Sequence, residues 1–157
     1  MGGIPPSEGD LAAVGAALLE AEAAAGEGEI PVGALILAPD GKVIATGRNS
    51  RVHEKDPTAH AEVNAIREAA RVLGDRVLDG CTLVVTLEPC VMCAGVILAA
   101  RVPRVVFGAW DEKAGAVGSV YDLLRDGRLP HAVPEVVGGV LADECAALLA
   151  DFFRARR

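Results

Sequence analysis

Two cysteines three positions apart are the clearest candidates for chemistry in this sequence. Cys90 and Cys93 lie in the stretch TLEPCVMCAG, residues 86–95, directly after a Glu-Pro pair. A C-x-x-C that follows a strand and opens a helix can be a redox pair, half of a structural metal site, or part of a catalytic metal site that takes its missing ligand from elsewhere. By itself the pattern leaves all three interpretations open.

A second pair of candidate residues lies upstream in DPTAHAEVNA, where His60 and Glu62 stand at the start of an expected helix. If the N-termini of this helix and of the cysteine helix face each other, one imidazole and two thiolates meet, and both positive helix ends favour the thiolates. These three ligands are typical of zinc, with the fourth tetrahedral position left for water. In a regular helix His60 and Glu62 would point ~200° apart, so they converge only if the first turn is irregular.

Two roles are open for Glu62. As a fourth ligand it would close the site and make it structural, whereas beside the metal it would be the acid/base that moves protons. The combination of H-x-E with P-C-x-x-C is the signature of the zinc nucleobase deaminases, in which the Glu is not a ligand.

Length and composition restrict the class of protein. The chain has 157 residues, 52% of them hydrophobic, which suffices for one core. We expect a single domain at 11–157 after a flexible N-terminus at 1–10. The cysteines lack the regular spacing of a disulfide framework, and the sequence has neither a basic leader nor an apolar run of ~18 residues. We therefore expect a reduced, cytoplasmic protein without a membrane segment.

The net charge of −7 at first argues against a nucleic-acid partner, because phosphate binding depends on Lys and Arg. Its distribution weakens that argument. Residues 1–41 hold seven acids and no bases, and the rest of the chain carries 15 of each. The ending RARR is the most basic point, although cations also suit the C-terminal end of a helix.

Hydrophobic periodicity predicts alternating helices and strands. We expect helices at 11–26, 61–74, 93–101, 118–127 (brief) and 141–157, a hairpin around Pro39-Asp40-Gly41, and strands at 81–87, 103–109 and 135–141. This order indicates an α/β protein with a three-layer α/β/α fold and a five-stranded mixed sheet, its first strand pair antiparallel and the later ones parallel.

Residues 11–157 resemble the bacterial tRNA-specific adenosine deaminases of the cytidine-deaminase-like superfamily. The H-A-E and P-C-x-x-C pair marks the superfamily. More specific segments carry the resemblance to the tRNA enzymes; they are GEIPVGALIL, DPTAHAEVNAIREAA, TLEPCVMCAGVILAARVPRVVFGA, DEKAGAVGS and LADECAALLADFFRARR.

The resemblance implies a role for individual residues. It implies that one zinc ion is held by His60, Cys90 and Cys93, and that Glu62 shuttles protons. The expected substrate-binding residues are Asn49, which would bond the flipped adenosine, Ala61 and Glu88, then Asp111 and Lys113 at the anticodon entrance, and Phe152, Arg154, Arg156 and Arg157 in the tail. Trp110 could stack on a splayed base or simply cap a strand end.

The function implied by the resemblance is hydrolytic deamination of the wobble adenosine to inosine in a tRNA anticodon, with arginine tRNA as the substrate, by a homodimer that pairs through the helix at 93–101. One alternative is a deaminase of a free nucleobase or nucleoside of the guanine or cytosine type, which would not need the basic tail. A second is a non-catalytic, zinc-stapled binding module. His53 and His131 are expected at the surface, and Cys81 and Cys145 as small hydrophobic residues.

Overall fold

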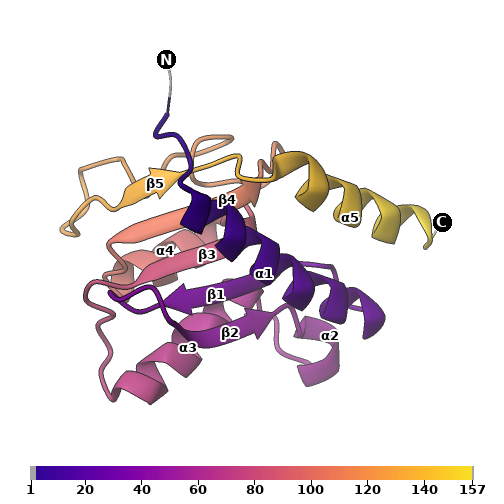
Figure 1. Cartoon of the computed structure of the whole chain (residues 1–157), viewed down its shortest axis with the longest axis horizontal. Coiled ribbons are helices and arrows are strands. Elements are labelled where there is room, and N and C mark those ends of the chain that lie inside the picture. Colours follow the sequence, from indigo (N-terminus) through magenta and orange to yellow (C-terminus); the bar gives the residue numbers. More distant parts are fainter. Residues whose placement is uncertain (1–2, 157) are drawn as a thin grey trace.

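A five-stranded sheet lies between two layers of helices in the computed structural model, which describes residues 3–156 (Figure 1). In chain order the elements are α1 (Glu8–Gly26), β1 (Gly33–Leu37), β2 (Val43–Arg48), α2 (Arg51–Glu54), α3 (Ala61–Leu73), β3 (Thr82–Leu87), α4 (Val91–Ala99), β4 (Arg104–Ala109), β5 (Glu135–Val137) and α5 (Ala142–Arg154). The expected three-layer α/β/α fold with a mixed sheet is confirmed.

The sheet has the strand order β2-β1-β3-β4-β5. β1 pairs antiparallel with both β2 and β3, whereas β3–β4 and β4–β5 are parallel. Since β2 and β3 both run opposite to β1, their carboxyl ends lie at one edge of the sheet, together with that of β4. The segments that carry His60 and Cys90 leave the sheet at this edge.

Strand side chains alternate between two cores, one on each face of the sheet. Leu35, Val84 and Val106 pack with α1 and with Cys145 of α5. Ile36, Val85 and the residues in phase with them pack with α3 and α4. Burial on both faces explains why the central strands read as continuous apolar runs.

Gly47 of β2 sets how closely α3 can approach the sheet. A Cβ at this position would lie 2.4 Å from the carbonyl oxygen of Ala61 and 2.6 Å from the nitrogen of Ala65. Both atoms belong to the helix backbone and cannot move aside. The absence of a side chain therefore lets the first turn of α3, with His60 before it, lie directly against β2.

Helix α1 begins earlier than the sequence analysis expected. Ser7 is its N-cap and forms a capping box with Asp10, so residues 8–10, assigned above to a flexible N-terminus, are helical. Residues 1–2 lie outside the described part of the chain. Neither α1, at 19 residues, nor any other helix within residues 3–156 is long and apolar enough to cross a membrane.

The brief helix expected at 118–127 is wrong. The segment is irregular, with an isolated bridge between Val117 and Asp122. Gly118 has a φ of +130°, which ends any helical path, and Arg125 donates from Nη2 to the Val117 carbonyl at 3.0 Å. Helix α2, which follows β2, was not expected at all.

The ion pair between the buried Asp10 and the partly exposed Arg104 should stabilise the fold, and a substitution can test this. Arg104 donates from both Nη atoms to the Asp10 carboxylate at 2.8 and 2.9 Å, and these bonds lower the pKa of Asp10. Asp10→Asn should reduce the free energy of unfolding by about 1–3 kcal/mol at neutral pH. Because the folded pKa is depressed, this contribution is complete above the ordinary value of 3.8 and is lost as pH falls through the folded value.

Urea titrations of wild type and Asp10→Asn over a pH series measure this difference. Asp151→Asn is the matched control, because its ion pair with Arg154 is exposed and should contribute less than about 1 kcal/mol. Equal destabilisation by the two substitutions, or an Asp10 effect that does not shrink at acid pH, would contradict the account.

Candidate active site

The three candidate metal ligands meet at the N-termini of α3 and α4. His60 is the N-cap residue of α3, Cys90 is the N-cap residue of α4, and Cys93 lies in the first turn of α4. The His60 Nδ1 atom lies 3.4 Å from the Cys93 Sγ and 3.6 Å from the Cys90 Sγ, and the three atoms lie within 4.8 Å of one another. Tetrahedral zinc with its usual bond lengths separates N and S ligands by about 3.6 Å. The donor set therefore fits zinc.

The two thiols have opposite acidities. A hydrogen bond from the Cys93 thiol, assisted by His60 and opposed by burial, lowers the pKa of Cys90 to about 3. The Cys90 thiolate, followed by burial, raises the pKa of Cys93. One thiolate is thus already favoured in the protein, and a cation between the two sulfurs favours deprotonation of the second.

Glu62 lies beside the ligand set and not within it. Within residues 3–156, the mutually close donor atoms are those of His60, Cys90 and Cys93 alone. The Glu62 side chain is 4% exposed, and burial raises its pKa to about 7. A carboxyl group with this pKa can both accept and donate a proton near neutral pH.

The backbone of His60 explains how this arrangement is possible. His60 has extended φ and ψ of −73° and 155°, so the regular helix starts only at Ala61. The angular spacing of a helix therefore does not apply between His60 and Glu62, because His60 precedes the first turn of α3.

A cavity of about 170 Å³ opens beside these residues. Its lining consists of Ile30, Val32, Asn49, Arg51, His60, Ala61, Glu62, Leu87, Glu88, Cys90, Asp111 and Ala114. Four of the expected substrate-binding residues, Asn49, Ala61, Glu88 and Asp111, are therefore at the cavity. Sequence reasoning missed Arg51, which lies two residues after Asn49, and the apolar residues Ile30 and Leu87, although both lie within segments that carry the resemblance.

Asn49 offers the cavity an unused hydrogen-bond acceptor. Its Nδ2 donates to the Ile30 carbonyl at 3.4 Å, and its backbone nitrogen donates to the Val32 carbonyl at 3.1 Å. Its Oδ1 is the one buried side-chain oxygen or nitrogen in the described chain that has no partner. A buried acceptor without a partner is costly, which suits an atom reserved for a ligand.

Comparison with known proteins agrees with this geometry. A family model for the cytidine and deoxycytidylate deaminase zinc-binding region matches residues 7–109. The chain belongs to this deaminase family. It is 48% identical over 141 residues to the tRNA-specific adenosine deaminase of Bacillus subtilis, covering 90% of this chain and 86% of that protein. The resemblance to bacterial tRNA-specific adenosine deaminases is thereby confirmed.

Other similar proteins include a much longer protein, a solved tRNA deaminase and a solved guanine deaminase. A tRNA(Ile)-lysidine synthase of Deinococcus deserti is 51% identical over 92% of this chain, which spans only 27% of that protein's length. A solved tRNA:A34 deaminase, studied for A-to-I editing at the wobble position, matches with a TM-score of 0.83 and 42% identity, covering 87% of this chain and 98% of that one. The guanine deaminase from Nitrosomonas europaea matches with a TM-score of 0.76 and 28% identity, covering 95% and 86%.

Glu88 lines the cavity and also holds the loop that follows β4. Its carboxylate accepts hydrogen bonds from the backbone nitrogens of Asp111 at 2.9 Å and of Val117 and Ser119 at 3.0 Å each, and from the Ser119 hydroxyl. Burial opposes its ionisation, but these bonds outweigh burial and lower the pKa of Glu88. A Cβ on Gly115 would lie 2.3 Å from this carboxylate. Glu88 therefore binds the loop at 111–119, which forms one wall of the cavity.

Three of the remaining expected contacts, Lys113, Arg154 and Arg156, line a second hollow of about 700 Å³, formed by the same loop and α5. Its other lining residues are Ala150 and Phe153. Phe152, which we expected to touch RNA, does not line the hollow but supports it, because the Arg156 guanidinium lies 3.9 Å from its ring centroid. Phe153 is 47% exposed and lines the hollow. Arg157 lies outside the described residues.

The remaining residues singled out in the sequence, namely Trp110, two histidines and two cysteines, lie outside the candidate site. Trp110 lines neither hollow, and its ring meets Phe107 edge to face at 4.8 Å, so the structure favours the strand-end role. His53 and His131 are exposed, as expected. Cys81 and Cys145 are buried, and burial raises the pKa of each thiol.

Glu88→Gln should loosen the loop at 111–119 without removing a ligand. The substitution replaces one accepting oxygen by an NH₂ group, which faces backbone donors that are then left without partners. We expect a loss of about 1–3 kcal/mol in the free energy of unfolding and an unchanged zinc content. Glu54→Gln is the control, because Glu54 is exposed and accepts from Ser50 alone. Thermal unfolding and elemental analysis measure both quantities, and an unperturbed Glu88→Gln protein would refute the role of this carboxylate.

Proposed function

We propose that this chain is a zinc-dependent deaminase that converts the wobble adenosine of a tRNA anticodon to inosine, and that arginine tRNA is its substrate. The observation that carries the proposal is the position of the basic hollow. The loop at 111–119 supplies Asp111 and Ala114 to the catalytic cavity and Lys113 to the hollow that contains Phe153 and Arg154. A base can enter the cavity while the neighbouring phosphates and bases lie on a cationic, aromatic surface.

The size of the cavity supports a single-base substrate. At about 170 Å³ it is smaller than the roughly 300–1,000 Å³ of pockets that enclose drug-sized ligands, so ribose and phosphates remain outside. An anticodon loop presents unpaired bases, which are extruded at lower cost than bases in a duplex. The similarity to the B. subtilis tRNA-specific adenosine deaminase and to the solved tRNA:A34 deaminase supports the same substrate.

The residues of the cavity have distinct roles in this reaction. His60, Cys90 and Cys93 would hold one zinc ion per chain, and this ion would supply the activation of a water molecule for attack on C6 of adenine. Glu62 accepts the proton that this water releases and returns protons to the ring nitrogen and to the departing amine, so that ammonia leaves and inosine remains. Asn49 offers its free oxygen to the base, and Leu87 and Ile30 exclude water beside it.

We also propose that the protein works as a cytoplasmic homodimer that pairs through α4. This helix, VMCAGVILA, contains no charged residue, and its Val91 is exposed. An uncharged helix with an exposed apolar residue is suited to contact with a second copy.

The alternative function is deamination of a free base, which the similarity to guanine deaminases favours. Such an enzyme would share His60, Glu62 and the cysteine pair. It would have no use for the hollow between Lys113 and α5, and this difference separates the two functions experimentally.

Substitutions in the metal site should separate ligands from the proton carrier. Cys93→Ala should abolish the single zinc ion, whereas Glu62→Gln should keep it and reduce turnover by about 10²–10⁴-fold, because proton transfer is lost. Cys81→Ala, a buried cysteine elsewhere in the fold, is the control and should retain both zinc and activity. Elemental analysis with an ammonia-release assay checks this, and zinc loss from Glu62→Gln would instead identify a closed structural site.

Replacement of Arg154 and Arg156 by Ala should weaken RNA binding and leave zinc in place. Each lost phosphate contact should reduce the slope of log affinity against log salt by about one. Arg71→Ala, on the exposed face of α3, is the control. Binding and inosine formation are measured with an arginine-tRNA anticodon stem-loop at several salt concentrations.

Substrate panels decide between the two functions. Stem-loops with guanosine or cytidine at the wobble position should still bind and give no product, because the base is selected in the cavity. Free adenosine, cytidine and guanine should be poor substrates. Turnover of a free base or nucleoside as fast as the stem-loop, with full activity in the tail variant, would establish the alternative.

A further inference from the structure

Arg51 is the fixed positive charge at the catalytic cavity. Of the residues that line it, only Arg51 and His60 can be cationic, and His60 is a candidate metal ligand. Arg51 is the first residue of α2 and is exposed. It is separate from the hollow lined by Lys113, Arg154 and Arg156, which lies at α5.

The Arg51 guanidinium is largely uncommitted. Its Nε donates to the Pro57 carbonyl at 3.1 Å. Within residues 3–156 it forms no ion pair, although arginines such as Arg48 and Arg104 are paired with carboxylates. An arginine presents five donors in a planar fork, so the two Nη groups of Arg51 remain available to a ligand.

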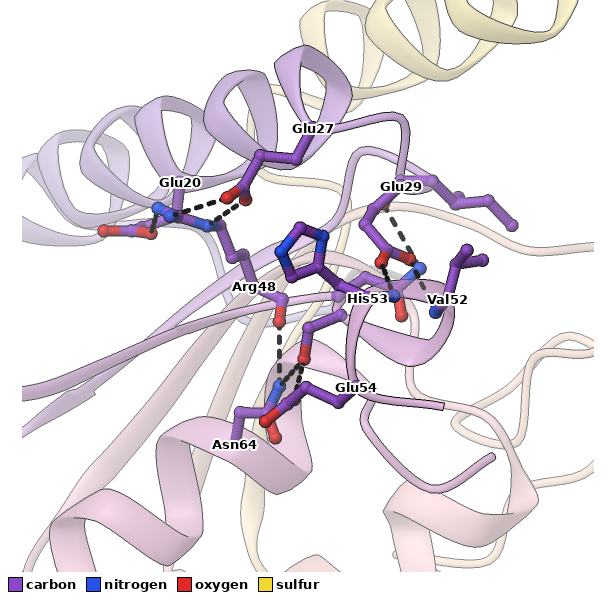
Figure 2. A network of polar contacts seen from close by, with 11 residues as sticks. Glu20, Glu27, Glu29, Arg48, Val52, His53, Glu54 and Asn64 are labelled. Carbon is purple, nitrogen blue, oxygen red and sulfur yellow. Dashed lines mark hydrogen bonds and ion pairs between the residues drawn. The ribbon is translucent and has the colours of Figure 1, made fainter. Parts of the chain in front are cut away.

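The short helix that carries Arg51 is held in place by contacts that involve Glu29 and Asn64 (Figure 2). The carboxylate of Glu29, which is buried, accepts from the backbone nitrogens of Val52 at 3.2 Å and His53 at 2.7 Å. Asn64 of α3 donates to the Arg48 carbonyl and to the Ser50 hydroxyl, each at 2.9 Å. A four-residue helix is not stable by itself, so these contacts fix the backbone from which Arg51 extends.

We propose that Arg51 binds a phosphodiester next to the adenosine whose base occupies the cavity. The inference rests on the proposed RNA substrate. With the base inside, the two flanking phosphates lie at the cavity mouth, where a guanidinium fork can donate two parallel hydrogen bonds to one of them. A free base has no such group. Arg51 is therefore a specificity-determining residue that favours a polynucleotide over a nucleobase.

The elements that carry the two cationic surfaces lie at one edge of the molecule (Figure 1). The figure shows α2 and the C-terminal part of α5 at the same edge of the molecule, with the end of α1 drawn between them. Arg51 provides the cationic contact at α2, and the hollow at Lys113 and α5 provides a second one. Two separated cationic contacts fix the direction of the strand as well as its affinity.

The test removes the charge from the protein and from the RNA in turn. The substrates are the anticodon stem-loop and two versions in which a neutral methylphosphonate replaces the phosphate on the 5′ or the 3′ side of the target adenosine. The variants are Arg51→Gln and Arg51→Lys, with Arg76→Gln as the control, because Arg76 is exposed and does not line the cavity. KM, kcat and zinc content are measured for every combination.

We expect Arg51→Gln to raise KM for the natural stem-loop about tenfold or more, as for loss of a charged hydrogen bond, without change in kcat or zinc. One of the two methylphosphonates should raise the KM of the wild type by a similar factor and have no further effect on Arg51→Gln. Arg51→Lys should recover part of the loss, and Arg76→Gln should behave as wild type.

Three results would overturn the inference. The first is a methylphosphonate effect as large in Arg51→Gln as in the wild type, and the second is an unchanged KM in the variant. The third is zinc loss or an equal fall in kcat on all substrates, which would show that Arg51 only braces the chain at Pro57. A wild-type enzyme that deaminates a free base and no stem-loop would instead refute the proposed function, so the two failures are distinguishable.

Discussion

The meeting of two helix N-termini at one sheet edge is the constraint on which the rest of the structure depends. His60 and Cys90 are 30 residues apart, and their side chains must come within bonding distance of one ion. The antiparallel position of β1 between β2 and β3 satisfies this requirement, because both outer strands then end at the same edge. The missing side chain of Gly47 lets α3 start directly against the sheet. Positive helix ends at this point favour thiolates.

The short segment between β3 and α4 connects the metal site to the substrate-facing wall. Glu88 donates its backbone nitrogen to the Ala109 carbonyl, while its carboxylate holds the loop at 111–119. The next residue, Pro89, accepts from the nitrogen of Ala116 at 2.8 Å, and Cys90 follows it. One run of three residues thus fixes a candidate ligand and the loop opposite it. A displacement of this segment would therefore disturb both the candidate ligand and the loop.

Sequence reasoning succeeded where one physical signal determined the outcome. Apolar runs identified the strands, and the helix stop at Gly74 identified the end of α3, since a glycine with φ of +67° ends a helix at low cost. Sequence reasoning failed at 118–127, because side chains from elsewhere in the chain hold the backbone there. Such contacts leave no periodicity in the local sequence. The buried position of Asp10 was also invisible, because its partner Arg104 lies 94 residues away.

The candidate site, like the fold, could be predicted from the sequence only in part. His60 with Glu62, and Cys90 with Cys93, are each local in sequence, and the combination of the two patterns is a known signature, so their grouping could be predicted. The roles of Glu88 and Phe152 could not, because each depends on the direction in which a side chain turns: Glu88 toward a loop backbone, and Phe152 beneath Arg156. A pattern specifies which residue is present, whereas packing decides which atoms face the ligand.

The distribution of ion pairs resolves the apparent conflict between an acidic chain and an RNA substrate. Several acids of the N-terminal 41 residues are used internally: Asp10 pairs with Arg104, Glu20 and Glu27 with Arg48, and Glu29 caps α2. Their arginine partners are counted in the net charge as well, so pairing leaves the total of −7 unchanged, and in the described part of the chain Glu29 is bound by backbone amides and not by a cation. By contrast, Arg51 at the cavity and Lys113 at the hollow beside α5 form no ion pair within residues 3–156. Since exposed charges are screened beyond roughly 10 Å, a phosphate responds to these nearby cations far more than to the total of −7.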